Sequence, residues 1–184
     1  MNNPLNDILA RSRQLYSQAD IQAAIANMAA AIKKDLEQKE VLVLCVMKGA
    51  VPVTAALMQQ LSLPLAIKLD YIHATRYGNA LSGGEIRWLA LPQTELKGQT
   101  VLVVDDIFDE GHTLRAIVDY CYAQQAGLVK TAVLVEKQHQ RKAHAFKVDY
   151  VGLSVPDQYV FGFGMDCEGW GRNLNEIYAL KQNA

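Results

Sequence analysis

Three stretches of the sequence are apolar without interruption, and they limit the fold more than any other feature. They are VLVLCVM at 41–47, VLVV at 101–104 and AVLV at 132–135. A strand with one face in water alternates apolar and polar residues, whereas a strand covered on both faces does not. Segments with the apolar spacing of helices lie between these stretches, the clearest from Ser17 to Leu36. Buried strands that alternate with helices predict an α/β domain whose central, mainly parallel β-sheet is flanked by helices.

Length and composition favour one domain over residues 1–184. Hydrophobic residues make up 51% of the 184 and charged residues 20%, which provides enough apolar material for a sizeable core. The net charge of −1 argues against nucleic-acid binding through bulk electrostatics, and no apolar run reaches the length of a membrane span. Cys45, Cys121 and Cys167 are odd in number and lack C-x-x-C spacing, so we expect buried thiols and a reducing, cytoplasmic location.

Four carboxylates follow the second apolar stretch within six residues. Asp105 and Asp106 come directly after it, and DEGHT (109–113) leads into a helix around Leu114. Ligands of parallel α/β folds bind outside the carboxyl ends of the strands. A glycine and a threonine at the start of a helix, with the backbone N–H groups there, can form a phosphate cradle. The carboxylates must face another part of the ligand, such as sugar hydroxyls or Mg²⁺, so the stretch predicts a site for a sugar phosphate with metal-bound pyrophosphate.

Other interpretations of these acids explain less of the pattern. Each acid alone could be a helix cap or a solvent-facing side chain, but that does not account for the strand, the acids, D-E-G-x-T and the helix together. A receiver domain would place an acidic pair after its first strand, where this chain has Met47, Lys48 and Gly49. A Walker nucleotide site is excluded because no G-x-x-x-x-G-K-[ST] occurs.

The stretch VLVVDDIFDEGHT (101–113) resembles the phosphoribosyl-pyrophosphate signature of the type I phosphoribosyltransferases. Three more segments are similar to those of the hypoxanthine-guanine phosphoribosyltransferases. They are the pyrophosphate loop VMKGA (46–50), the purine-selecting lysine segment VEKQHQR (135–141) and the purine and metal segment PDQYVFGFGMDCEGWGRNL (156–174). The resemblance implies the type I phosphoribosyltransferase fold, with a small hood formed by the N-terminal region and about 146–184.

The resemblance also implies roles for residues around the sugar and the phosphates. Asp105 and Asp106 would hold the ribose hydroxyls directly or through Mg²⁺, and Asp166 would bind a second Mg²⁺. The 5′-phosphate would be bound mostly through backbone amides, those of Glu110, Gly111, His112 and Thr113, with the Thr113 hydroxyl helping. Pyrophosphate would be bound by a group of three residues, Lys48, Gly49 and Arg172. A non-proline cis peptide is implied before Lys48.

Around the base, the resemblance makes Asp109 the acid/base group near purine N7 and Lys137 the donor to the 6-oxo group. Tyr159 would stack on the base, and Val160 would contact it through its backbone. The aromatic residues of YVFGF (159–163) alternate at strand spacing. We therefore expect one ring at the ligand and at least one in the core.

The segment from His73 to Glu85 predicts a long loop, which is typical of a lid. It resembles the mobile catalytic loop of the family, in which Tyr77 would cover the pyrophosphate. The chain departs from the family pattern at three positions: Arg76 replaces the usual serine, Ala50 a common glycine, and Gln158 a residue that is often basic. These departures bear on substrate preference and on closure of the loop.

The resemblance predicts a cytoplasmic purine-salvage transferase with Asp109, Lys48 and Tyr77 as catalytic residues. It would join hypoxanthine or guanine to 5-phosphoribosyl 1-pyrophosphate with Mg²⁺, and by analogy it would be a homodimer or homotetramer. Two alternatives stay open: a relative that uses xanthine or another base, and a nucleotide-sensing, RNA-binding regulator of the same fold.

Overall fold

A computed structural model describes residues 3–37, 39–61, 66–77, 85–142 and 146–181 of the chain. Its helices are α1 (Pro4–Ala10), α2 (Gln18–Asp35), α3 (Val51–Gln60) and α4 (His112–Ala123). Its strands are β1 (Ser12–Tyr16), β2 (Glu40–Val46), β3 (Ala66–Tyr77), β4 (Glu85–Ala90), β5 (Thr100–Phe108), β6 (Leu128–Gln138), β7 (Tyr150–Pro156), β8 (Val160–Phe161) and β9 (Ile177–Leu180).

Six strands form the central sheet in the order β4-β3-β2-β5-β6-β7. All neighbours are parallel except β3 and β4, which are antiparallel. β2 and β5 lie in the middle, where Val43 is level with Leu69 on one side and Leu102 on the other. Residues 41–46 and 101–105 are all buried, as expected for strands covered on both faces. The predicted α/β fold with a mainly parallel sheet is confirmed.

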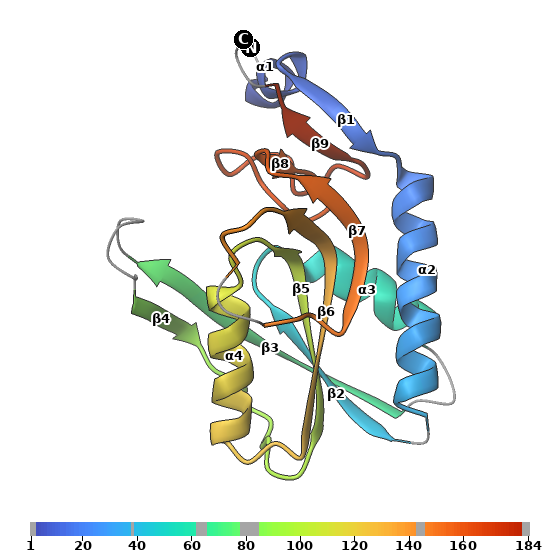
Figure 1. Ribbon diagram of the computed structural model, residues 1–184, viewed down its shortest axis with the longest axis vertical. Coiled ribbons are helices and arrows are strands. Elements are labelled where there is room, and N and C mark those ends of the chain that lie inside the picture. Colours follow the sequence, from blue (N-terminus) through green and yellow to red (C-terminus); the bar gives the residue numbers. More distant parts are fainter. Residues whose placement is uncertain (1–2, 38, 62–65, 78–84, 143–145, 182–184) are drawn as a thin grey trace.

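The connections between the strands place the helices on both faces of this sheet. α3 connects β2 to β3, whereas α4 connects β5 to β6 in the opposite direction along the sheet. Because such crossovers are right-handed, the two helices cover opposite faces. In Figure 1, α4 lies on one side of the sheet, and α2, which packs on α3 and β7, lies on the other. The direction of winding changes between β2 and β5, which is where open α/β sheets bind ligands.

The helix predicted after Ser17 is confirmed as α2. It begins at a capping box, in which the Asp20 N–H donates to Oγ of Ser17 and the Ser17 N–H donates to the Asp20 carboxylate. Its buried face consists of apolar residues at helical spacing, among them Ile21, Ile25, Met28 and Ile32. This face covers the sheet and fixes the N-terminal part of the chain next to β7.

A smaller sheet of order β1-β9-β8 is antiparallel and lies beyond the carboxyl ends of β6 and β7 (Figure 1). Together with α1 it forms the hood, whose own core contains Ile8, Phe161 and Cys167 at 2% exposure or less. Pairing of β1 with β9 brings the two ends of the chain together. The sequence patterns did not indicate α1 or β1, because each is too short to show a clear apolar period.

β3 is longer than the sequence indicates. The sequence predicted a loop from His73 onward, but the strand continues to Tyr77, which pairs with Glu85 of β4. This extension of β3 has no apolar pattern in the sequence, because the backbone hydrogen bonds of a strand pair do not require apolar residues. Residues 78–84, to which the rest of the lid prediction applies, lie outside the described residues.

The three cysteines are free and buried, as the sequence predicted. In the part of the chain that the structure describes, no helix is both long and apolar enough to cross a membrane.

Candidate active site

A cleft of about 690 Å³ opens between the carboxyl ends of β2 and β5. A smaller hollow of about 190 Å³ adjoins it, and both are lined by residues 106, 107, 109 and 166. Residues from distant parts of the chain meet here. The larger cleft contains Lys48, Gly49, Asp105, Asp106, Asp109, Glu110, Gly111, His112, Thr113, Asp166 and Arg172, and the smaller hollow adds Lys137, Tyr159 and Val160. Of the predicted site residues, Tyr77 alone is not placed, because its side chain lies outside the described part of the structure.

Gly111 shapes the turn that leads from β5 into α4. It is the N-cap of the helix with φ of 85°, a conformation that favours glycine, and a Cβ there would lie 2.4 Å from Cε2 of Phe108. The helix begins with the Arg115 N–H donating to the Gly111 carbonyl at 2.9 Å. The backbone N–H groups of His112 and Thr113 therefore have no acceptor within the helix. Together with the positive end of the helix dipole, they form a site for an anion such as phosphate.

The loop after β2 is in close contact with two other parts of the site. The peptide between Met47 and Lys48 is cis, as the resemblance implied. A Cβ on Gly49 would lie 1.7 Å from Oδ2 of Asp106, and a Cβ on Gly164 would lie 2.0 Å from the Gly49 carbonyl oxygen. The backbone of Gly49 is thus packed between the end of β5 and the C-terminal segment.

Asp105 and Asp106 are adjacent acids in a region of low solvent access. Asp105 is 8% exposed, and its Oδ1 accepts a hydrogen bond from the Asp106 N–H at 2.9 Å. Burial raises the pKa of Asp105 well above its usual range, and the charge of Asp106 raises it further. Burial also raises the pKa of Asp106, although hydrogen bonds and the positive charge of Arg172 oppose the change. Two such carboxylates favour a ligand that brings hydroxyl donors or a cation.

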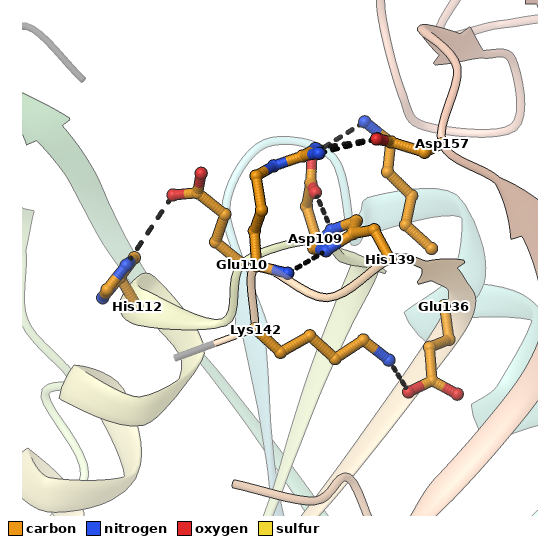
Figure 2. A network of polar contacts seen from close by, with 9 residues as sticks. Asp109, Glu110, His112, Glu136, His139, Lys142 and Asp157 are labelled. Atoms are coloured by element: carbon orange, nitrogen blue, oxygen red, sulfur yellow. Dashed lines mark hydrogen bonds and ion pairs between the residues drawn. The ribbon is translucent and has the colours of Figure 1, made fainter. Parts of the chain in front are cut away.

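Asp109 follows β5 directly and is contacted on both carboxylate oxygens. Lys137 Nζ donates to Oδ2 at 2.7 Å, and His139 Nε2 lies 2.6 Å from Oδ1. Figure 2 shows Asp109 and His139 pointing toward one another. Burial raises the pKa of Asp109, but the interactions with Lys137 and His139 outweigh it, so the pKa is lowered overall. Asp109 is therefore an ionised carboxylate at the junction of the two hollows, where it can accept a proton.

Sequence reasoning missed His139. Its segment, VEKQHQR, is polar and typical of a solvated loop, yet the side chain is only 3% exposed. The spacing held a signal, because Lys137 and His139 are two residues apart at the end of β6. Side chains two apart on a strand point to the same face, so a lysine in the site implies that His139 points there too.

The C-terminal segment closes the cleft from the hood side. The Arg172 guanidinium donates to the Gly164 carbonyl at 2.6 Å and to the Asp166 carboxylate. The Gly169 N–H donates to the other oxygen of Asp166 at 2.7 Å. A cation and a carboxylate are thereby held at one edge of the cleft, opposite the ends of β2 and β5.

The aromatic residues of this segment have different surroundings. Tyr159 is 52% exposed beside the smaller hollow, and its hydroxyl donates to the Asp166 carbonyl at 3.2 Å. Phe161 is fully buried in the hood core and stacks on Tyr178 with ring centroids 5.6 Å apart. The prediction that at least one of these rings belongs to the core is confirmed by Phe161.

Two of the three departures from the family pattern lie in described parts of the structure. Ala50 is buried and is the N-cap of α3. Gln158 accepts a hydrogen bond at 2.7 Å from the guanidinium of Arg13 in β1. A positive charge therefore lies next to Gln158 after all, although it comes from the hood. The side chain of Arg76 lies outside the described part.

The binding features follow one another along the end of the sheet in a fixed order. The anion site of α4 comes first, then the acids of β5, then the hollow lined by Lys137 and Tyr159. This order suits a ligand with a phosphate at one end, a sugar in the middle and a flat base at the other end. With the doubly wound sheet and the hood, it defines the class of the type I phosphoribosyltransferases.

Comparison with known families agrees with this class. The phosphoribosyl transferase domain matches residues 12–169, so the chain belongs to the phosphoribosyltransferase family, as predicted. The hypoxanthine-guanine phosphoribosyltransferase of Streptococcus thermophilus is 34% identical over 169 residues, 91% of this chain and 92% of that protein. The hypoxanthine-guanine-xanthine phosphoribosyltransferase of Tritrichomonas foetus is 33% identical over 180 residues, 98% of this chain and 96% of that protein.

A solved structure has the same architecture. The hypoxanthine phosphoribosyltransferase of Staphylococcus aureus superimposes with a TM-score of 0.87 at 26% identity, covering 98% of this chain and 96% of that one. The predicted fold class is confirmed.

Proposed function

We propose that the protein joins hypoxanthine or guanine to 5-phosphoribosyl 1-pyrophosphate in purine salvage, and so produces IMP or GMP with pyrophosphate. The observation that carries the proposal is the Asp109–Lys137 pair, with Nζ 2.7 Å from Oδ2, at the junction of the two hollows. A 6-oxopurine offers N7 as a proton donor next to a carbonyl acceptor. Asp109 and Lys137 provide the matching acceptor and donor.

The phosphates are assigned to the larger cleft. The 5′-phosphate is bound by backbone N–H groups at the start of α4 and by the Thr113 hydroxyl. Pyrophosphate is bound by Lys48, the Gly49 backbone and Arg172. Tyr77 is assigned to cover it, on the basis of the family resemblance.

In the reaction, purine N9 forms a bond to ribose C1 while the bond from C1 to the pyrophosphate oxygen breaks. Positive charge develops on the sugar, and Asp105 and Asp106 stabilise it electrostatically. The purine loses its N7 proton to Asp109, and the leaving pyrophosphate keeps the electron pair. Lys48 and Arg172 neutralise the charge that builds up on this leaving group.

Mg²⁺ fits the donors of the site. Asp105, Asp106 and Asp166 supply carboxylate oxygens, which this ion prefers. Among the described residues, no group of three His, Cys, Asp or Glu side chains could hold a metal without other ligands. Phosphate and sugar oxygens of the substrate would complete the coordination, as is usual for Mg²⁺. When bound, the ion neutralises negative charge on the pyrophosphate.

The test of the proposal is turnover of hypoxanthine, guanine, xanthine and adenine with phosphoribosyl pyrophosphate and Mg²⁺. Hypoxanthine and guanine should react, whereas adenine should not, because an ammonium cannot accept a hydrogen bond from a 6-amino group. In Asp109→Asn, turnover should fall by about 10²–10⁴-fold, the usual contribution of an acid/base group. Loss of less than about threefold would contradict the role of Asp109.

Two alternative functions predict different results. Faster turnover of xanthine would favour a relative with a different base preference, and Arg13 beside Gln158 gives a reason to include it. A salt-dependent shift of RNA without turnover would favour an RNA-binding regulator. The net charge of −1 and the acids of the cleft, Asp105, Asp106 and Asp109, speak against the regulator.

A homodimer or homotetramer is also part of the proposal. Val51, Leu69 and Tyr71 are 45%, 56% and 44% exposed and line one apolar groove with Met47 and Met58. A second copy of the chain packed there would bury these side chains and contact the loop that carries Lys48. Light scattering should therefore report an oligomer, and Leu69→Glu should weaken it.

The free thiols are consistent with a reducing compartment, so we propose the cytoplasm.

A further inference from the structure

His139 has a defined ring orientation because both of its nitrogens are engaged. The Arg141 backbone N–H donates to Nδ1 at 3.0 Å, so Nδ1 must be the unprotonated nitrogen. The proton is therefore on Nε2, which donates it to Oδ1 of Asp109 at 2.6 Å. A backbone group on one side of the ring thus fixes a hydrogen bond to the carboxylate on the other side.

The loop that carries His139 is itself anchored. The guanidinium of Arg141 makes two hydrogen bonds to Asp157, at 2.7 and 2.8 Å, in the fork geometry that holds a carboxylate most firmly. Asp157 directly follows β7 and comes two residues before Tyr159, which leads into β8. In the view of Figure 2, Asp157 lies above Asp109. The Nδ1 acceptor of His139 is therefore held by a loop fixed to the purine side of the site.

During the proposed reaction, Lys137 cannot keep its ammonium group hydrogen-bonded only to Asp109. Its ammonium lies 2.7 Å from Oδ2 of Asp109 and is only 13% exposed, yet the proposed function requires it to donate to the 6-oxo group of the base. As the ammonium turns toward the base, its hold on Oδ2 weakens. This frees Oδ2 to face purine N7. Oδ1 must then be held by another group if the carboxylate is to keep its direction.

We propose that His139 is a positioning residue that holds Oδ1 of Asp109 and thereby directs Oδ2 to purine N7 while Lys137 binds the 6-oxo group. The inference rests on the proposed function. His139 keeps its Nε2 proton throughout, and the N7 proton moves to Oδ2. Its contribution is orientation of the carboxylate, which is why it acts through Asp109 and need not touch the substrate.

Other charged groups lie near Asp109 and His139 and bear on the test. Lys137 approaches from β6, Arg141 from the loop that follows, and Asp157 from the end of β7. Glu110 is the neighbour of Asp109 on the way to α4, and its carboxylate lies 3.7 Å from His112 Nε2. All of them stay in place in the variants below, so a change in Asp109 can be attributed to His139.

The experiment compares His139→Leu with His139→Gln. Glutamine can place an N–H group near the position of Nε2, whereas leucine fills the space without a donor. For His139→Leu we expect kcat to fall by about 10–100-fold, by analogy with the loss of a group that orients a metal ligand. KM for phosphoribosyl pyrophosphate should stay within about twofold, because the phosphate sites are untouched. His139→Gln should recover most of kcat.

Gln140→Leu is the matched control. Gln140 is an exposed residue of the same loop, so this variant should behave as wild type.

Two further measurements separate positioning from simple packing. In an Asp109→Asn background, His139→Leu should cause little additional loss, because its effect passes through Asp109. Carboxyl NMR of the free protein should give a higher pKa for Asp109 in His139→Leu than in wild type, with His139→Gln in between or unchanged. Equal losses in the leucine and glutamine variants, a full loss in the Asp109→Asn background, or an unmoved pKa of Asp109 would each overturn the inference.

The NMR measurement needs no purine, so the two proposals can fail separately. A protein that does not turn over 6-oxopurines contradicts the proposed function, whereas the dependence of the Asp109 pKa on His139 still decides whether His139 holds the carboxylate. If the leucine variant does not fold, His139→Gln and His139→Asn replace it. Asparagine is too short to place its N–H near the position of Nε2, so it should lose activity where glutamine keeps it.

Discussion

Asp106 and Gly49 meet so closely that a Cβ on the glycine would lie 1.7 Å from Oδ2 of the aspartate. Gly49 follows β2, and Asp106 lies near the end of the neighbouring parallel strand β5; the pairing of Cys45 with Val104 brings these strand ends together. Gly49 is not one of the described glycines with a positive φ, so residues other than glycine could adopt its backbone conformation. Glycine is required there because a carboxylate of the site occupies the space of a side chain.

Gly49→Ala should therefore impair the reaction more than the fold. The methyl group must displace the Asp106 carboxylate or the loop, and displacement of a site group by about 1 Å can reduce activity about 10²-fold. We expect kcat/KM for phosphoribosyl pyrophosphate to fall by that order, with unfolding free energy reduced by about 1–3 kcal/mol from overpacking. Steady-state kinetics and urea unfolding measure the two effects.

Gly98→Ala is the matched control for this substitution. Gly98 has φ of +72° and open space around its missing Cβ, and it lies outside the cleft. Strain in the backbone should reduce stability by about 1 kcal/mol and leave turnover unchanged. Wild-type kinetics in Gly49→Ala would show that Asp106 can move without consequence.

Lys137 should control the pH at which Asp109 becomes protonated. Burial raises the pKa of Asp109, but the interactions with Lys137 and His139 lower it by a larger amount, so the net shift is downward. Activity that needs the carboxylate should thus persist on the acid side to below its ordinary value of about 3.9. In Lys137→Gln the interactions with Lys137 that lower the pKa of Asp109 are lost, so the acid limb of kcat/KM against pH should move to higher pH. Lys147→Gln removes the same charge from an exposed position and should leave the limb in place.

Asp149 should make stability depend on pH without affecting turnover. It accepts hydrogen bonds from Lys130 Nζ at 2.7 Å and from the N–H and hydroxyl of Thr131, both at 2.9 Å. Burial raises its pKa, but these bonds outweigh it and the pKa is lowered. Because the folded state holds the charged form, the contribution is complete above the unfolded value of about 3.9 and is lost as pH falls through the lower folded pKa.

Asp149→Asn should consequently be less stable than wild type at pH 7, by about 1–3 kcal/mol for a charge-assisted bond, with the lower end expected at this partly exposed site. The difference should shrink in acid. Urea unfolding at pH 7 and in acid checks this. Kinetics should be unchanged, since Asp149 precedes β7 at the end of the sheet away from the cleft. A constant difference across pH would mean that the charge of Asp149 does not contribute.

The sequence revealed those parts of the fold and site that are encoded by local patterns. Continuous apolar residues marked β2, β5 and β6, because burial on both faces leaves no place for polar side chains. The stretch DEGHT marked the anion site, because a glycine turn at a helix start leaves backbone N–H groups that can bind phosphate. All the placed residues of the predicted site lie in two adjoining hollows.

Partners that come from distant segments were not predictable in this way. Gln158 is paired with Arg13 of the hood, and no feature near either residue indicates the other. The buried state of His139 depends on the loop anchored by Asp157, while its own neighbours in sequence are polar. β3 extends through polar residues because its partner β4 supplies backbone hydrogen bonds. In each case the deciding interaction is long-range, so the local composition gives the wrong indication or none.

Tyr159 and Phe161 offer a test of the division between ligand contact and core. They are two residues apart, yet Tyr159 is 52% exposed beside the smaller hollow and Phe161 is fully buried against Tyr178. Tyr159→Ala should weaken purine binding by about 1–3 kcal/mol, the value of one stacked base, while stability changes by about 0.5 kcal/mol or less. Phe161→Ala should instead reduce stability by about 3–5 kcal/mol, the usual result of emptying a buried aromatic site.

Calorimetric titration with a purine nucleotide and urea unfolding, performed on both variants, would separate the two effects. We expect Tyr159→Ala to lose affinity and Phe161→Ala to lose stability. The reason is that the hood fixes Phe161 in its own core and thereby directs Tyr159, on the other face of the segment, toward the base. If Tyr159→Ala lost stability and kept its affinity, the ring would belong to the packing of the hood. The base would then have to be held by Lys137 and the Val160 backbone without an aromatic surface.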